Sequence, residues 1–321
     1  MARPSRRRRQ ELTAGGTPAA GRPAPARTPS SPTPSRYRTQ RVKVPRPWWQ
    51  SPWAWGSAIT VVVVAVIVVF IVVANRPAAT SSAASNANQP VPASVLAAVT
   101  GVSSSVSDTI GAGGVSNPLE PVSGSPSALT GPTGHPELFY LGAEYCPYCA
   151  AERWSVVIAL SRFGTFSNLA ETTSSSSDEY PNTHTFSFYG ASYSSSYLDF
   201  ASLETADRSG NALQTPTTAQ QTLINTYDTS PYSSQNGGIP FMDLANSFIV
   251  SGTAVPPASL QGMTWEQIAA TLTDTQSPVA QAIIGNANWL TAGICKVNGG
   301  QPASVCGSTA ITSLESQLGS S

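Results

Sequence analysis

The most regular hydrophobic pattern in the chain lies between residues 138 and 160. A short apolar run at residues 138–141 ends at Gly142, and a second apolar stretch follows at residues 150–160. A short apolar run bounded by glycine is typical of a buried strand, whereas the second stretch is long enough for a helix. We therefore expect a strand, a tight turn and a helix.

Other patterns predict the neighbouring elements. Apolar residues between Val95 and Ile110 recur at helical spacing and predict one amphipathic helix, ending at the glycines of residues 111–114. Alternating apolar and polar residues predict strands at residues 183–188 and 197–203, and a hairpin at residues 241–250. These elements indicate a mixed α/β domain.

Capping signals predict three later helices. Thr215 is followed by proline and opens a helix that ends at Tyr227, because threonine caps helices and proline suits the first turn. Thr264 and Gln267 form a capping box that opens a second helix. Ser277 is also followed by proline and opens the last long helix, which we expect to end near Trp289.

A longer apolar run near the N-terminus has a different meaning. Residues 54–74 contain no charged residue and are about long enough to cross a bilayer. Tryptophans flank this run, as they do at membrane interfaces. We expect a transmembrane helix within residues 51–75. The run and the region before it are both too long for a cleaved signal peptide, so we interpret it as an uncleaved signal anchor.

The charges are distributed unevenly. Twelve of the 17 lysines and arginines precede Trp48, where the only acid is Glu11. A basic arm can bind nucleic acid, but beside a membrane span it favours a role in setting topology and in contacting the lipid bilayer. We expect no nucleic-acid partner. Positively charged segments beside a membrane span usually stay in the cytoplasm. We therefore expect the N-terminus in the cytoplasm, the span in the cell membrane and the rest of the chain in an extracytoplasmic compartment.

Composition then divides the chain. Residues 1–50 are rich in proline, arginine and serine and predict a disordered basic cytoplasmic tail. Residues 76–92 predict a flexible linker. Residues 93–321 predict one extracytoplasmic domain with its core at about residues 137–293. All four cysteines lie in this part, where disulfides persist.

The turn before the predicted helix carries the most distinctive chemistry. It reads Cys146-Pro147-Tyr148-Cys149, and proline suits the first helical position. A spacing of three places both sulfurs on one face, and the helix N-terminus favours a thiolate at Cys146. A disulfide across so short a loop would stabilise little. A zinc site would need further ligands, and neither His135 nor His184 lies in a ligand pattern. We expect no metal, and interpret the pair as redox-active.

These residues resemble the thioredoxin-like superfamily, and the Cys-Pro-Tyr-Cys tetrapeptide is the one common in glutaredoxins. Ile239 and Pro240 precede the predicted hairpin. Proteins of that superfamily carry a proline after a cis peptide bond at the start of this hairpin. The resemblance implies a thioredoxin-like sandwich, a mixed central sheet with flanking helices, behind one N-terminal transmembrane helix. Two positions depart from the pattern: Tyr140 replaces a buried acid and Ala150 replaces a lysine. The layout also resembles a membrane-anchored thioredoxin-like family catalogued as a domain of unknown function, DUF929.

The resemblance implies a role for each residue. Cys146 attacks a substrate disulfide and Cys149 resolves the mixed disulfide. Pro240 follows a cis peptide bond and turns Ile239 towards the substrate, which Tyr145 and Tyr148 also contact.

Nearby charges act in opposite directions. Glu144 and Glu152 would oppose formation of a thiolate if they lay close, whereas Arg153 would favour it. Cys295 and Cys306 predict a structural disulfide, with a second redox pair that relays electrons as the alternative.

The expected function is a membrane-anchored, extracytoplasmic thiol–disulfide oxidoreductase. It would act on exported proteins that carry thiols or disulfides, would exchange electrons with a membrane redox partner, and would need no bound cofactor. The alternative is a tethered binding or assembly module that keeps the fold without using its thiols.

Overall fold

The computed structural model describes residues 89–234 and 236–319. The predicted cytoplasmic tail, the predicted transmembrane helix at residues 51–75 and most of the predicted linker lie outside these ranges. Within them, no helix combines the length and the apolar character needed to cross a membrane. The structure therefore does not contain the fold class that we expected, in which a sandwich follows a transmembrane helix.

The central sheet has five strands, in the order β2, β10, β9, β3, β8. Their bounds are Glu120–Pro121, Phe248–Ser251, Phe241–Leu244, Glu137–Gly142 and Asp199–Glu204. The pair β3 and β8 is parallel, and the other neighbours are antiparallel. This is the predicted hairpin (β9 and β10) laid against the strand that precedes the cysteines.

The remaining strands form two separate small sheets. One contains β1 (Gln89–Pro90), β5 (Ala170–Thr173) and β6 (His184–Ser187), and the other contains β4 (Gly164–Ser167) and β7 (Ser192–Ser195). In the described residues, these five strands therefore lie outside the mixed central sheet. Strand β6 bonds only to β5 in its own sheet and packs against the helix α4, so it does not extend the central sheet.

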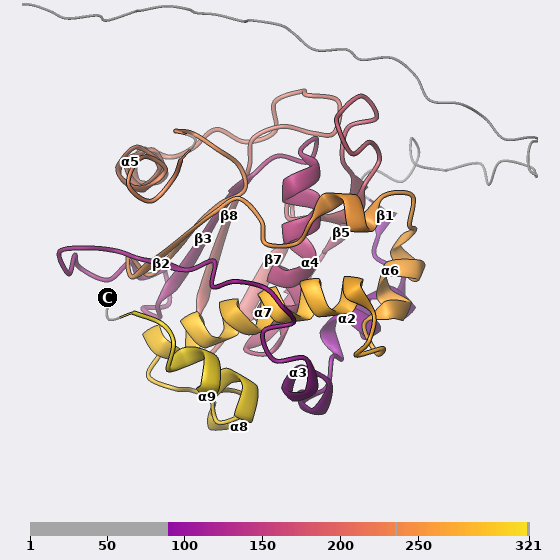
Figure 1. Cartoon of the computed structure of the whole chain (residues 1–321). Coiled ribbons are helices and arrows are strands. Elements are labelled where there is room, and N and C mark those ends of the chain that lie inside the picture. The colour runs from indigo at the N-terminus through magenta and orange to yellow at the C-terminus, as the bar shows by residue number, and fades with distance from the viewer. Residues whose placement is uncertain (1–88, 235, 320–321) are drawn as a thin grey trace, which may run out of the picture. The chain divides into compact units, whose positions relative to one another are not determined.

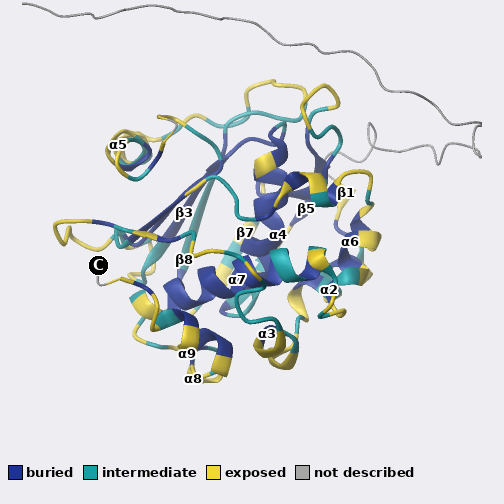
Figure 2. Cartoon of the chain, in the orientation of Figure 1, coloured by how far each residue is buried: buried dark blue, intermediate teal, exposed yellow. Residues whose placement is uncertain are grey.

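Helices cover both faces of the central sheet (Figure 1). Side chains alternate along β3, so Leu138 and Tyr140 face a core shared with α4 and α7, whereas Phe139 and Leu141 face a smaller core that includes Tyr227 of α5. Figure 2 shows that α4 and α7 are buried along most of their length. The helices are α2 (Ala93–Thr100), α3 (Ser104–Ile110), α4 (Pro147–Ser161), α5 (Thr218–Tyr227), α6 (Trp265–Thr271), α7 (Pro278–Val297), α8 (Ala303–Cys306) and α9 (Thr309–Glu315), with a 3-10 helix at Pro257–Leu260.

The capping signals located the helix starts well. Thr264 forms the predicted capping box with Gln267, and Ser277 caps α7 with proline at the first position. The cap of α5 is Thr217 rather than Thr215, and its box is completed by Gln220.

Two predicted helices had wrong bounds. The helix expected across residues 95–110 is two helices, because Ser103 accepts a hydrogen bond from the backbone of Val106 and starts a new N-terminus after Gly101. Helix α7 continues past Trp289 and through Gly293 to Val297, because no proline interrupts it and its next residues, including Ile294 and Cys295, are buried in the core.

Candidate active site around Cys146 and Cys149

The two cysteines lie at the junction of β3 and α4. Cys146 is the N-cap residue of α4 and Pro147 occupies the first turn. Proline is favoured there because its missing N–H needs no helical partner. Both cysteines are free thiols; Cys146 is 5 % exposed and Cys149 is 0 % exposed. The strand, turn and helix thus place one sulfur at the surface of the core and the other inside it.

The hydrogen bonds of Cys146 join two distant segments. Its Sγ accepts a hydrogen bond from the backbone N–H of Cys149 at 3.2 Å. Its thiol donates to the carbonyl oxygen of Ile239 at 3.7 Å. The peptide bond between Ile239 and Pro240 is cis. The structure therefore brings Cys146, Cys149, Ile239 and Pro240 together at one end of the central sheet.

The two thiols have pKa values shifted in opposite directions. The pKa of Cys146 is lowered, chiefly by a hydrogen bond from the thiol of Cys149, then by backbone N–H groups of the helix start and the charge of Arg153, while burial opposes the change. Burial raises the pKa of Cys149 well above its ordinary value, and the neighbouring Cys146 adds to this. Cys146 is thus the thiol that ionises first.

A buried ion pair lies next to the cysteines. Arg153 Nε and Nη2 donate to the two carboxylate oxygens of Glu204 at 2.9 and 2.7 Å, and both side chains are 0 % exposed. Arg153 Nη2 also donates to the carbonyl oxygen of Ala143, in the turn before Cys146, at 2.8 Å. Because Arg153 follows Cys149 by four residues on α4, both side chains lie on the same face of the helix.

Glu204 was not predicted as a site residue from the sequence. The residue ends β8, whose parallel pairing with β3 places it beside Gly142. The carboxyl ends of parallel strands meet at one edge of a sheet, so the pairing would have revealed the acid.

Two buried donors near the cysteines lack hydrogen-bond partners. They are the hydroxyl of Tyr140 and Nη1 of Arg153, whose guanidinium carbon lies 5.8 Å from the centre of the Tyr140 ring. Burial raises the pKa of Tyr140 well above its ordinary value, with the charge of Arg153 opposing and the two cysteines adding. Tyr140 therefore stays protonated beside the thiols.

The two acids that lie near the cysteines in the sequence, Glu144 and Glu152, have different hydrogen-bond partners in the structure. Glu144 is buried and accepts hydrogen bonds from Ser187 and, at 3.4 Å, from Thr172. Glu152 is buried on the other side of α4, where Asn286 and Thr253 donate to its carboxylate. Burial raises the pKa of Glu152 to about 7. Of the three charges in question, Arg153 is the one that lowers the pKa of Cys146.

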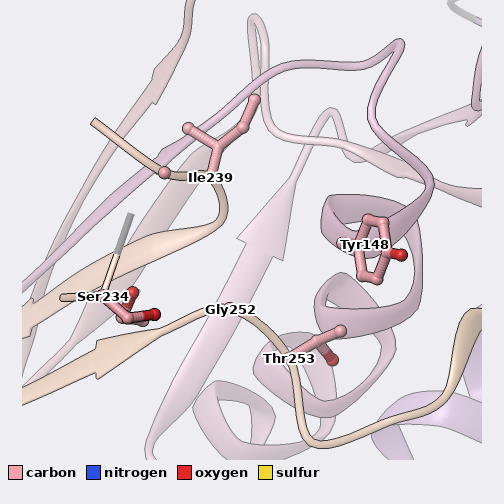
Figure 3. A pocket seen from close by; sticks show the side chains of 7 residues that line it. Tyr148, Ser234, Ile239, Gly252 and Thr253 are labelled. Atoms are coloured by element: carbon pink, nitrogen blue, oxygen red, sulfur yellow. The ribbon is translucent and has the colours of Figure 1, made fainter. Parts of the chain in front are cut away.

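A hollow of about 330 Å³ opens between Tyr148, which lies between the two cysteines in the sequence, and Ile239, whose carbonyl oxygen accepts from Cys146 (Figure 3). It contains Ile239 and Tyr148, two of the residues predicted to contact a substrate, and no charged side chain. Tyr148 is 39 % exposed, and its hydroxyl donates to Glu179 at 2.9 Å. The residues that line this hollow are Tyr148, Ser234, Gly238, Ile239, Ser251, Gly252 and Thr253. The third predicted contact residue, Tyr145, lines a different hollow of about 520 Å³.

The other residues singled out in the sequence lie elsewhere. Cys295 and Cys306 form a disulfide between α7 and α8, with an S–S distance of 1.94 Å. His135 contacts the hydroxyl of Thr133, and His184 contacts the carbonyl oxygen of Met263. Among residues 89–234 and 236–319, no group of three or more histidines, cysteines or acids could hold a metal ion.

Comparison with known proteins identifies a family. A family model described as "Domain of unknown function (DUF929)" matches residues 122–296, which include both cysteines, Arg153, Glu204 and the Ile239–Pro240 bond. No curated protein and no solved structure matches the chain. Because the family model covers more than half of its residues, this chain belongs to the DUF929 family.

Proposed function

We propose that this protein is a thiol–disulfide oxidoreductase related to the thioredoxin-like superfamily. The observation that carries the proposal is the pair of unequal thiols: Cys146 caps a helix and accepts the N–H of Cys149 at 3.2 Å, while Cys149 is fully buried. A lowered pKa at one thiol and a raised pKa at the other divide the pair into an attacking and a resolving group.

In the reducing direction, the thiolate of Cys146 attacks one sulfur of a substrate disulfide. A new bond joins Cys146 to the substrate, and the substrate's second sulfur leaves as a thiolate that takes a proton. Cys149 then loses its proton and attacks Cys146, which forms the Cys146–Cys149 disulfide and releases the first substrate sulfur as a thiol. The same steps run backwards when the enzyme oxidises a dithiol.

The buried resolving thiol needs help to ionise. Arg153 and Tyr140 supply two donors without hydrogen-bond partners beside it, and the charge of Arg153 lowers the pKa of Cys149 against the effect of burial. We assign them the stabilisation of the Cys149 thiolate during the second step. They take the place of the acid and the lysine that the thioredoxin pattern would have at Tyr140 and Ala150.

The substrates that we propose are exported proteins with thiols or disulfides. The disulfide between Cys295 and Cys306 supports an oxidising, extracytoplasmic location, because disulfides are rare where thiols are kept reduced. Electrons would pass to or from a membrane redox partner.

One observation favours a second candidate, a binding or assembly module that does not use its thiols. Cys146 is only 5 % exposed, which limits the approach of a folded substrate, whereas Tyr148 is exposed beside an uncharged hollow that could hold a peptide. The two candidates differ in whether a covalent intermediate forms.

Trapping that intermediate distinguishes them. In Cys149→Ser, Cys146 can still attack but cannot be released intramolecularly, so disulfide-linked adducts with exported proteins should accumulate on a non-reducing gel. Cys146→Ser should give none. A binding module gives no adducts in either variant and captures its partners equally well with both cysteines replaced; that result would overturn the oxidoreductase proposal.

A further inference from the structure

A third hollow lies where α3, α8 and α9 meet the end of α4. These three helices lie together along one edge of the domain, next to α7 (Figure 1). The hollow has a volume of about 190 Å³ and shares no lining residue with the hollow lined by Tyr148 or the hollow lined by Tyr145. Its lining residues are Thr100, Val102, Ser104, Ser107, Arg162, Ser304, Val305, Ser308 and Ile311.

The charged group of this hollow is Arg162, the C-cap residue of α4. Its Nη1 donates to the hydroxyl of Thr291 at 2.7 Å, and its Nη2 donates to the hydroxyl of Ser107 at 2.9 Å. Both partners are neutral. Arg162 forms no ion pair within 4.0 Å with a carboxylate of the described residues.

Burial acts on this guanidinium without a compensating ion pair. It lowers the pKa of Arg162 to about 10, with the charge of Asp108 opposing. The carboxylate of Asp108 accepts the backbone N–H of Ala310 at 2.8 Å and does not reach the guanidinium. A partly buried cation with neutral partners gains from an incoming anion, because the anion supplies the missing charge-assisted hydrogen bonds.

The remaining lining residues define the shape of the ligand. One threonine and four serines line the hollow together with the arginine, and the hydroxyl of Ser308 makes no capping bond with α9. A guanidinium has five N–H donors, of which two are used in the bonds above. Val102, Val305 and Ile311 add an apolar wall. Cation, hydroxyls and apolar wall together match a carboxylate with a short aliphatic chain.

We propose that this hollow binds a small organic monocarboxylate, with its oxygens on Arg162 and the surrounding hydroxyls and its aliphatic part against Val102, Val305 and Ile311. A single cation with Asp108 nearby favours one negative charge over two. This inference is independent of the thiol chemistry proposed above.

Thermal denaturation of the full chain tests the proposal. Butyrate should raise the Tm in a saturable manner, whereas its neutral isostere butyramide and equimolar sodium chloride should not. Equal effects of butyrate and butyramide would show that no charge is recognised, and a larger effect of inorganic phosphate would show that the site prefers another anion. Either result overturns the proposal.

Variants locate the effect. Arg162→Gln should weaken butyrate binding at least tenfold. Because Arg162 also bonds to Thr291 and Ser107, a second variant avoids any loss of folding: Ser304 is exposed on the rim, so Ser304→Asp adds a repelling charge and should abolish binding. Its matched control, Ser304→Asn, has nearly the size of aspartate without the charge and should bind butyrate more tightly than Ser304→Asp does. Undiminished binding in Ser304→Asp overturns the assignment of this hollow.

Discussion

Arg153 of α4 and Glu204 at the end of β8 form a fully buried ion pair with two hydrogen bonds. The pair orients the guanidinium so that one nitrogen also holds the carbonyl of Ala143, in the turn that carries Cys146. The charge of Arg153, which contributes to lowering the pKa of Cys146, is thus held in place by hydrogen bonds to a residue of the central sheet.

The contributions of Arg153 and Glu204 to the free energy of unfolding should be strongly coupled. Arg153→Met leaves the Glu204 carboxylate buried without its partner and should lower the free energy of unfolding by about 3–5 kcal/mol. Arg153→Met/Glu204→Leu removes both charges and should be destabilised less than Arg153→Met alone. Urea denaturation of the parent chain, Arg153→Met, Glu204→Leu and the double variant measures the coupling. Additive effects of the two replacements would contradict a direct interaction.

The pKa of Cys146 should depend on the donor at position 149. Cys149→Ala removes the side-chain donor that contributes most to lowering this pKa, whereas Cys149→Ser keeps a hydroxyl in its place. We expect a higher pKa for Cys146 in Cys149→Ala than in Cys149→Ser. The pH dependence of alkylation by iodoacetamide measures both values. Equal pKa values would assign the effect to the backbone N–H groups and Arg153.

Tyr140→Phe tests the assigned role in the second step. The hydroxyl makes no hydrogen bond, so its loss should change the free energy of unfolding by less than about 1 kcal/mol. If it stabilises the Cys149 thiolate, release of a mixed disulfide at Cys146 should slow, by up to about tenfold for 1.4 kcal/mol. Stopped-flow release of a chromogenic thiol measures the rate. Tyr197→Phe is the control, and an unchanged rate in Tyr140→Phe would exclude the role.

Glu152 should make stability fall as the pH rises. Its folded pKa of about 7 exceeds the ordinary value of 4.5, so the folded state binds more protons than the unfolded state between these values. The free energy of unfolding therefore decreases as the pH rises from about 4.5 to 7, by at most about 3 kcal/mol from this group. Glu152→Gln removes that dependence, and urea denaturation at several pH values measures it.

Other buried groups should keep part of the pH dependence of stability in Glu152→Gln. Burial also raises the pKa values of Glu171 and Asp243 to about 7, so part of the slope should remain in Glu152→Gln. Asn286 Oδ1 is buried without a partner, and a rotated amide could accept a hydrogen bond from the introduced glutamine. A slope identical to that of the parent chain would show that Glu152 does not titrate in this range.

The disulfide between Cys295 and Cys306 should increase stability without affecting the rate of thiol exchange. It closes a separation of 11 residues, so replacing Cys295 and Cys306 by serine should lower the free energy of unfolding by about 2–3 kcal/mol. The rate of thiol exchange at Cys146 should stay the same. Thermal denaturation and an exchange assay measure the two effects. Lost exchange with unchanged stability would instead favour an electron relay through this pair.

Local signals in the sequence determined the elements that position the cysteines. The apolar run before Gly142, proline after Cys146 and the caps at Thr264 and Ser277 each act within a few residues, so the strand and the helix starts could be predicted. The break after Gly101 was missed, because a serine cap competes with a continuous apolar pattern.

Tertiary structure decided which side chains surround the sulfurs. Glu204 reaches Arg153 only through the parallel pairing of β8 with β3, and Glu144 and Glu152 point to separate partners although both are close in sequence to the cysteines. It also decided that β5 and β6 form their own sheet. Strand pairing and burial depend on contacts between distant residues, which hydrophobic periodicity and capping do not encode; the sequence therefore predicted the thiols, while the fold set their unequal acidity.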